Sequence, residues 1–286
     1  MADEVPLLGA VLAKTERFLR TRGVPRPRLE AEQLAAAVLG LPRIQLYLQF
    51  DRPLTLEERG KLRGLVARRG HREPLAWLLG QVGFHAVDLE VGPGVLVPRP
   101  DTETLVDAAI GWIEPGAHVV DIGTGTGAIA IALAVARPDL TIVAVEREAA
   151  PLAIARANVA RHGVAERVRV VEGDLLQGVP DDKPIDWIVS NPPYIPTADI
   201  DALEPEVSRH EPRAALDGGA DGLRVLARIA ALAGKRAAKG VLLEVGAGQA
   251  VRVADGLRRV GFPVLRTFDD AAGVARVVGG RREEAP

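Results

Sequence analysis

Asn191, Pro192, Pro193 and Tyr194 follow one another after an apolar run and have the residue types needed to hold a planar nitrogen. An amide or exocyclic amine nitrogen is a poor nucleophile because its lone pair is delocalised into the neighbouring π system. Two acceptors that bind its two hydrogens would orient this lone pair. The Asn191 side-chain oxygen can be one acceptor and the Pro192 backbone carbonyl the other, since the paired prolines fix φ. Tyr194 offers a flat face for stacking.

This segment predicts catalysis by Asn191, Pro192 and Tyr194, with Pro193 completing the substrate-binding surface. Such a site needs no strong general base if a sulfonium leaving group drives the transfer, because the proton can then leave afterwards. Its task is positioning and electrostatic preorganisation. The structural alternative is a simple turn after a strand.

A glycine-rich loop upstream predicts a cofactor site. Residues 118–122 are expected to form a buried strand, and a helix is expected to begin near Ala128. Glycines between them let the backbone turn sharply and let a ligand approach closely, and ligands of parallel sheets bind at the carboxyl ends of the strands. The loop residues predicted to contact the cofactor are Gly123, Thr124, Gly125, Thr126 and Gly127.

The loop alone fits two cofactors. Gly123, Gly125 and Ala128 also match the dinucleotide fingerprint, with Glu146 where a ribose-binding acid is expected, so a NAD-binding oxidoreductase is one alternative. Asp121 favours S-adenosylmethionine, because a carboxylate before the glycines would repel a pyrophosphate but attract an ammonium group. The Asn-Pro-Pro-Tyr segment also favours it, since a dehydrogenase has no use for that segment. A tight turn without a ligand is the structural alternative.

Acidic residues after the next two expected strands complete the predicted cofactor site. Glu146 ends the strand at 141–146, and its carboxylate can accept hydrogen bonds from both ribose hydroxyls. Asp174 follows the third strand and could accept a hydrogen bond from the adenine amino group. Each could instead be a solvent-facing charge at a strand end. The motifs together predict an S-adenosylmethionine-dependent methyltransferase that acts on an amide or exocyclic amine nitrogen.

The composition narrows the class of protein. The 286 residues are 48% hydrophobic and 26% charged, which is typical of a soluble protein with a sizeable core. A net charge of -2 gives no general attraction to nucleic acid, so we expect no stable nucleic-acid partner. The chain has no cysteine, and its histidines lack metal-ligand spacing, so we expect no metal. Without a signal peptide or a membrane-spanning run, the expected location is the cytoplasm.

The spacing of apolar residues predicts two parts joined by a linker. Residues 4 to about 70 are expected to be helical. One helix face carries Arg59, Lys61, Arg63, Arg68 and Arg69, and it is expected to face solvent, with a docking patch for a macromolecule as the alternative. Beyond residue 100, strands alternate with helices and end in two adjacent strands. This pattern predicts an α/β fold of the class I methyltransferase type, a Rossmann-like doubly wound seven-stranded sheet with an antiparallel final strand. The expected divisions are an N-terminal helical domain at 1–73, a β-hairpin linker at 74–100 and a methyltransferase domain at 101–286.

Further segments add to Asn191–Tyr194: Glu73–Ala76 with Gly80, Val97–Glu103, Glu211–Leu216 with Gly218 and Gly219, Leu242–Gly246 with Gln249, and Asp270, Gly273 and Arg276. With these segments the chain resembles, over nearly its whole length, the protein-(glutamine-N5) methyltransferases that modify peptide chain release factors, the PrmC/HemK family. The resemblance implies a helical N-terminal domain that recognises the release factor and a catalytic domain that methylates the glutamine of its Gly-Gly-Gln loop.

When the family's cofactor contacts are placed on the matching positions, the resemblance implies a set of residues that contact S-adenosylmethionine. They are Gly123–Gly127, Glu146, Leu175 and Asn191. The family often has aspartate in place of Glu146 and an aromatic residue in place of Leu175. The expected partner is a release factor, and the expected state is a monomer.

Besides the NAD-binding oxidoreductase, three alternatives stay open from the sequence. Adenine-N6 methyltransferases use the same Asn-Pro-Pro-Tyr chemistry, although the near-neutral charge and the lack of a target-recognition domain argue against DNA. A glutamine methyltransferase of a ribosomal protein would differ only in the N-terminal region. A catalytically silent binding module is the third.

Overall fold

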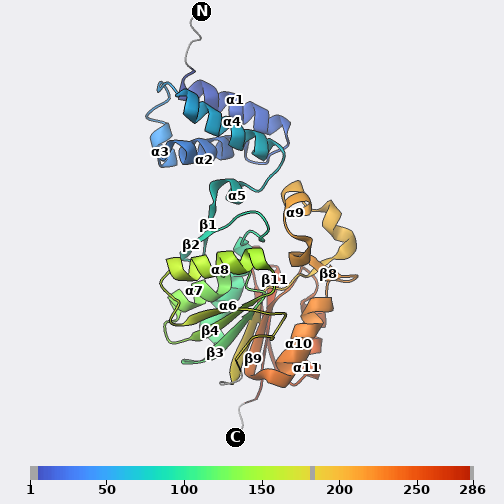
Figure 1. Cartoon of the computed structure of the whole chain (residues 1–286). Helices are drawn as coiled ribbons and strands as arrows, with labels where there is room; N and C mark the ends of the chain where they lie inside the picture. The colour runs from blue at the N-terminus through green and yellow to red at the C-terminus, as the bar shows by residue number, and fades with distance from the viewer. Residues whose placement is uncertain (1–5, 181–183, 284–286) are drawn as a thin grey trace, which may run out of the picture. The chain divides into compact units, whose positions relative to one another are not determined.

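The structure is a computed structural model that describes residues 6–180 and 184–283 (Figure 1). The chain folds into two compact units. One contains the N-terminal residues up to Gly80 together with Glu204–His210, and the other contains Gln81–Leu203 and the residues from Glu211 onward. Within the described ranges, no helix has the length and hydropathy needed to cross a membrane.

The first unit is helical and consists of α1 (Leu8–Thr21), α2 (Pro27–Leu39), α3 (Arg43–Leu46), α4 (Leu56–Gly70), α5 (Leu75–Leu79) and α9 (Pro205–His210). Helix α2 is capped at its C-terminus by Gly40, whose left-handed conformation has no steric cost for glycine. Helix α4 begins with a capping box, in which the Thr55 hydroxyl accepts from the Glu58 backbone and the Glu58 carboxylate accepts from the Thr55 backbone. Inward-facing leucines such as Leu12 and Leu34 form the core of this unit.

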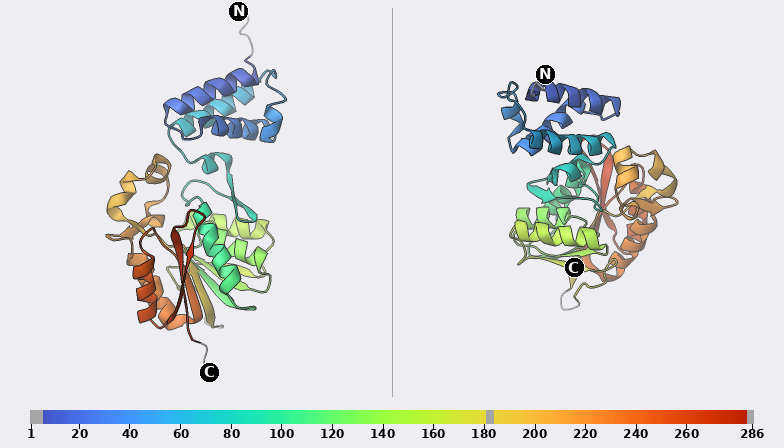
Figure 2. Two further views of the ribbon diagram at one scale, coloured as in Figure 1. Left: turned by 180° about the vertical axis from the view of Figure 1, so that it is seen from behind. Right: turned by 45° about the horizontal axis from the view of Figure 1, so that its top comes forward.

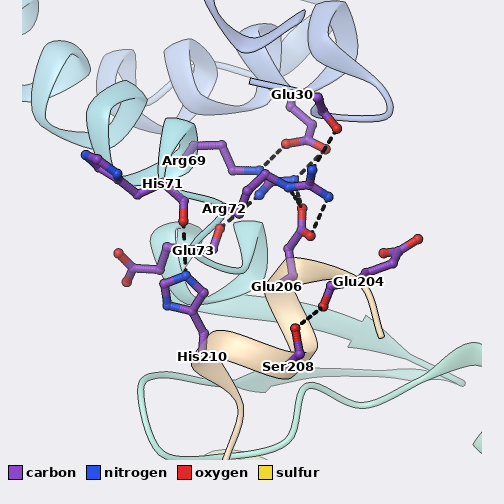
Figure 3. A network of polar contacts seen from close by, with 10 residues as sticks. Glu30, Arg69, His71, Arg72, Glu73, Glu204, Glu206, Ser208 and His210 are labelled. Atoms are coloured by element: carbon purple, nitrogen blue, oxygen red, sulfur yellow. Dashed lines mark hydrogen bonds and ion pairs between the residues drawn. The ribbon is translucent and has the colours of Figure 1, made fainter. Parts of the chain in front are cut away.

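A network of charged side chains joins α9 to α2 and α4 within the first unit (Figure 3). Arg69 on α4 contacts Glu30 on α2 and, at 2.7 Å, Glu206 on α9. Arg72 donates two further hydrogen bonds to Glu206, at 2.7 and 2.6 Å. The prediction that Arg69 faces solvent is therefore wrong, because its side chain is only 3% exposed. Its carboxylate partners are distant in sequence, so the pattern of the helix face does not reveal them.

The second unit is built on seven strands: β3 (His118–Ile122), β4 (Thr141–Glu146), β5 (Val168–Glu172), β6 (Ile185–Ser190), β9 (Ala237–Glu244), β10 (Val264–Asp269) and β11 (Ala275–Arg281). Their order in the sheet is β10-β11-β9-β6-β3-β4-β5. The strands from β9 to β5 run parallel, whereas β11 is antiparallel to both of its neighbours. This arrangement confirms the predicted doubly wound sheet with an antiparallel final strand.

Side chains along the strands alternate between two hydrophobic cores, one on each face of the sheet. Val119 and Val189 belong to the core that includes α6 (Glu103–Trp112), α7 (Ala128–Ala136) and part of α8 (Ala149–Arg161). Val120 and Ile188 belong to the core that includes α10 (Arg224–Arg236) and α11 (Ala250–Arg259). Figure 2 shows helices on both sides of the sheet. Largely apolar runs such as 118–122 form strands here because both of their faces are buried.

Short elements complete the second unit. The hairpin of β1 (Gln81–Phe84) and β2 (Val87–Glu90) adds Phe84 and Leu89 to the first of the two cores. Strand β7 (Ile195–Pro196), which directly follows Tyr194, pairs in parallel with β8 (Asp217–Gly219). This pairing fixes the chain immediately after the Asn-Pro-Pro-Tyr segment. The remaining short elements are the 3-10 helices η1 (Pro100–Thr102), η2 (Thr197–Ala202) and η3 (Arg213–Ala215).

Candidate active site

A cavity of about 650 Å³ lies in the second unit, where the loops after β3, β4, β5 and β6 meet. This is the carboxyl edge of the parallel strands, where ligands of open α/β sheets bind. The predicted site residues that line it are Gly123, Thr124, Gly125, Thr126, Glu146, Asp174, Leu175, Asn191, Pro192 and Pro193. Asp121, Gly127 and Tyr194 are not among the residues that line the cavity.

The glycine loop is shaped by backbone angles that favour glycine. Gly123, Gly125 and Gly127 have φ values of +72°, +59° and +85°, a region that side chains with a Cβ rarely adopt. The loop is tied to β4 by hydrogen bonds from the Gly123 and Thr124 backbone to the Val145 carbonyl, at 2.9 and 3.0 Å. Gly127 lies behind the cavity at the start of α7, where an added Cβ would meet Ile131 at 2.9 Å.

Glu146 is held rigidly by the backbone around it. Its Oε2 accepts a hydrogen bond from Gly125 at 3.0 Å, and its Oε1 accepts from Arg147 and Glu148 at 2.8 and 2.9 Å. A carboxylate has about four acceptor positions, so the chain itself occupies most of them. The carboxylate is therefore fixed in one orientation at the cavity wall, with little capacity left for a bidentate contact.

Asp121 lies beneath the loop and is fully buried, with 0% of the residue exposed. Its Oδ2 accepts a hydrogen bond from the Thr124 hydroxyl at 2.6 Å, and its Oδ1 has no geometric hydrogen-bond partner among the described residues, although the Ala130 backbone amide lies near enough to lower the pKa of the carboxyl. Burial raises the pKa of this carboxyl to about 7, and the nearby Glu146 carboxylate adds to the increase. A buried acid of this kind is stabilised in its charged form only when a cation or another donor comes close.

Asp174 and Leu175 form the wall of the cavity after β5. Asp174 is paired with Arg228 at 3.0 Å and lies 4.0 Å from Arg147, so two cations flank its carboxylate. Leu175 has a positive φ of +59°, which is uncommon for a residue with a branched side chain. Its side chain packs against the core on the α10 face of the sheet. The wall at this position is therefore aliphatic and conformationally fixed.

Asn191 reaches the cavity directly after β6, and its amide orientation is fixed by one hydrogen bond. Its Nδ2 donates to the Thr102 hydroxyl at 3.0 Å, which leaves Oδ1 available as an acceptor. The preceding Ser190 donates to the Ile122 carbonyl at 2.7 Å and thereby ties the end of β6 to the end of β3. The motif and the glycine loop are thus held side by side, as the sequence predicts for neighbouring parallel strands.

Tyr194 lies behind the cavity wall. Its hydroxyl donates to Glu244 Oε1 at 3.1 Å, and its backbone carbonyl accepts from Gln249 Nε2 at 2.9 Å. Burial, and secondarily the Glu244 carboxyl, raise the pKa of the Tyr194 hydroxyl above its usual range. The described contacts therefore anchor the partly buried Tyr194 at both its hydroxyl and its backbone, and the stacking role of its ring stays a prediction.

Thr102, Glu244, Gln249 and the Arg99–Glu211 ion pair are parts of the site that the sequence does not single out by role. Arg99 and Thr102 line the cavity, and Arg99 binds the buried Glu211 at 2.6 Å. The sequence signal for these residues is that they fall in the segments that resemble the PrmC/HemK family. Those segments do not show what each side chain does.

Comparison with known families and proteins gives matches along both units. Residues 10–80 match the PrmC N-terminal domain family, and residues 102–206 match the Methyltransferase small domain family. The release factor glutamine methyltransferase of Geobacter sulfurreducens is 46% identical over 97% of this chain and 98% of its own length. The protein of the same name from Rhodospirillum rubrum is 42% identical over 99% of this chain and 88% of its own.

Solved structures with low sequence identity share the fold. The hMettl16 catalytic domain in complex with MAT2A 3'UTR hairpin 6 has a TM-score of 0.55 and 18% identity, and covers 77% of this chain and 82% of its own. A methyltransferase from Pyrococcus furiosus has a TM-score of 0.52 and 18% identity, over 69% of this chain and 90% of its own. At such identities the likeness concerns the fold alone.

Proposed function

The chain belongs to the release factor glutamine methyltransferase family, and we propose that it transfers a methyl group from S-adenosylmethionine to the glutamine side-chain nitrogen in the Gly-Gly-Gln loop of peptide chain release factors. The observation that carries the proposal is the fixed Asn191 amide. Its nitrogen is bound to Thr102, so its oxygen is the group it can present to a ligand in the cavity.

The residues around the cavity fit S-adenosylmethionine. Asp121 lies fully buried beneath the glycine loop, and a cationic amine bound in the cavity would stabilise its charged form. Glu146 and the glycine loop would hold the ribose and the amino-acid portion, while Asp174 and Leu175 would border the adenine. The volume of about 650 Å³ lies within the range of small-molecule sites. When bound, the cofactor supplies a methyl group on a positively charged sulfur.

The chain's part in the reaction is to position the accepting nitrogen. Asn191 Oδ1 and the Pro192 carbonyl would accept the two hydrogens of the glutamine amide, which directs the nitrogen lone pair toward the methyl group. Pro193 fixes the backbone between these acceptors and the anchored Tyr194. The proton can leave to water after the transfer, so no residue of the chain must remove it beforehand. Catalysis by this site is preorganisation of hydrogen-bond acceptors.

We propose that the N-terminal helical domain, predicted at 1–73, recognises the release factor and that the 101–286 domain carries out the transfer. The match of residues 10–80 to the PrmC N-terminal domain supports this division of labour. Because the proposed substrate acts in translation termination, the proposed location is the cytoplasm, and we propose that the enzyme acts as a monomer.

Transfer of tritium from labelled S-adenosylmethionine to purified release factor tests the function. The expected result is label on the loop glutamine, located by mass spectrometry, and no label on a release factor in which that glutamine is replaced by alanine. DNA and purified ribosomal proteins serve as competing acceptors in the same assay. Labelling of either in place of the release factor would contradict the proposal.

A further inference from the structure

Glu244 is a buried acid beside the Asn-Pro-Pro-Tyr segment that the proposed reaction does not use directly. It ends β9, whose neighbour β6 leads into that segment, and Leu243 pairs with Ser190 in the sheet. Only 1% of the residue is exposed. Its Oε1 accepts from the Tyr194 hydroxyl, and its Oε2 has no geometric partner among the described residues. An acid is costly to bury in this way.

Thr102 connects Glu244 to Asn191. A hydroxyl has one hydrogen to donate and two lone pairs that accept, and the Thr102 oxygen already accepts from Asn191 Nδ2 at 3.0 Å. Its own hydrogen is then free to point at Glu244, and the Thr102 hydroxyl lies near enough to that carboxyl group to lower its pKa. The direction of one hydrogen bond therefore sets the direction of the next, from Glu244 through Thr102 to Asn191.

The same carboxyl also holds the other end of the segment. Tyr194 is bound to Glu244 through its hydroxyl, and Gln249, five residues further along, binds the Tyr194 carbonyl at 2.9 Å. Gln249 is itself fixed by the Gly246 backbone, which donates to its Oε1 at 2.8 Å. Asn191 and Tyr194 are thus both anchored to the residues around the end of β9.

We propose, given the function proposed above, that Glu244 is a positioning residue for methyl transfer, which acts through Thr102 to keep the Asn191 side-chain oxygen facing the cavity. In its ionised form Glu244 can only accept, so the Thr102 hydroxyl must donate to it and must accept from Asn191. In its protonated form Glu244 can donate to Thr102, and the Asn191 amide then loses the constraint on its orientation.

The charges around Glu244 place this change near neutral pH. Burial raises the pKa of the carboxyl to about 7, the hydroxyls of Thr102 and Tyr194 and the Arg276 guanidinium oppose the increase, and the Asp101 carboxylate adds to it. Arg276 is shared between Asp101, at 3.1 Å, and Asp270, at 2.8 Å, so its charge is largely compensated. The ionised, positioning form of Glu244 therefore becomes the major form as the pH rises above about 7.

The test compares the full-length enzyme with its Glu244→Gln variant at saturating S-adenosylmethionine and release factor. We expect the wild-type kcat to rise through about pH 7, and the variant to be lower by ~10-fold or more at high pH, the scale of a supporting hydrogen bond, with no such rise. The affinity for S-adenosylmethionine, measured by calorimetry, should stay within about twofold. Asp121 also titrates near pH 7, but its effect should appear in cofactor affinity.

Matched variants separate positioning from general damage. Glu114→Gln is the control, because Glu114 accepts a hydrogen bond from the Trp187 indole at 2.6 Å and does not line the cavity. It should keep both the rate and the pH profile. Thr102→Val should reproduce the loss of Glu244→Gln without adding to it in the double variant, whereas Thr102→Ser should retain activity. If Glu244→Gln does not fold, the two Thr102 variants carry the test.

The outcomes distinguish this proposal from the proposed function. A wild-type enzyme that labels the release factor, together with a Glu244→Gln variant that keeps the rate and the rise in kcat, would overturn the positioning role alone. A loss of kcat in the Glu114→Gln control equal to that in Glu244→Gln would also overturn the positioning role alone. A wild-type enzyme that leaves the release factor unlabelled but methylates another acceptor would overturn the proposed substrate, and the Glu244 comparison would then be made with that acceptor.

Discussion

Replacing Asp121 with asparagine should change the pH dependence of folding stability through a single buried group. The wild-type carboxyl is fully buried, has one hydrogen-bonded oxygen and one without a partner among the described residues, and has a pKa raised to about 7. Asparagine has nearly the same shape and can still accept from Thr124, but it cannot ionise. The substitution therefore removes the titration while it keeps the packing.

The raised pKa of Asp121 determines whether the free energy of unfolding rises or falls with pH. Between about pH 5 and pH 7 an unfolded aspartate is ionised, whereas native Asp121 keeps its proton. The free energy of unfolding of the wild type therefore falls as the pH rises through this window, and it levels off above about pH 7. Roughly two pKa units at about 1.4 kcal/mol each give a loss of about 3 kcal/mol. The asparagine variant lacks this loss.

Urea denaturation of both proteins at about pH 5 and about pH 8 measures the effect. The stability of Asp121→Asn minus that of the wild type should increase by about 3 kcal/mol between the two conditions. Other buried acids, such as Glu244, are present in both proteins and cancel. A difference that stays constant with pH would refute the raised pKa. Adding S-adenosylmethionine at pH 8 should stabilise the wild type more than the variant, because only the wild type offers an anion to the cofactor's amine.

Three further substitutions test other parts of the structure. Asn191→Ala should fold and bind cofactor in calorimetry but lose at least ~10²-fold in kcat, the scale of one preorganised polar group; near-normal turnover would reject the nitrogen cradle. Tyr194→Phe removes a hydrogen bond that lowers the pKa of Glu244, so the rise of kcat with pH should move to higher pH, and an unmoved profile would count against that link. Arg69→Ala removes the cation shared by Glu30 and Glu206 and leaves Arg72 bound to Glu206. Thermal or urea unfolding should show a loss of about 3 kcal/mol, whereas a loss well under ~1 kcal/mol would show that Arg69 contributes little.

The fold could be predicted because its signals are local. Each central strand is a short run of apolar residues, and Val119 and Val120 point into different cores as a two-residue period requires. The positive φ values of Gly123, Gly125 and Gly127 explain why glycine stands at these positions. The place of α9 could not be predicted, because it depends on ion pairs between Glu206 and arginines more than a hundred positions earlier.

The cavity residues could be predicted only in part, for a related reason. Asn191 and Glu146 follow directly from the strands before them, so their approach to the glycine loop is a property of the parallel sheet. The Tyr194 hydroxyl donates to Glu244, which lies fifty residues further along the chain. The two residues come together because β9 is the neighbour of β6 in the sheet. The stacking face that the sequence predicts for Tyr194 stays a prediction, and its contacts with Glu244 and Gln249 add an anchoring role.

Asp121 and Glu244 show how the site can separate cofactor binding from nitrogen positioning. Both are buried acids with one oxygen engaged by a hydroxyl, and burial raises the pKa of each to about 7. Asp121 lies under the glycine loop, so a cation that enters the cavity can compensate its charge. Glu244 lies behind Asn191 and Tyr194, and hydroxyls hold its charge without any ligand. The first acid should therefore govern how tightly the cofactor binds, and the second how well the accepting nitrogen is aimed once it is bound. A single buried acid could not both compensate the cofactor's charge and hold Asn191 in place. Binding of the charged cofactor would change the ionisation of that acid and with it the orientation of Asn191.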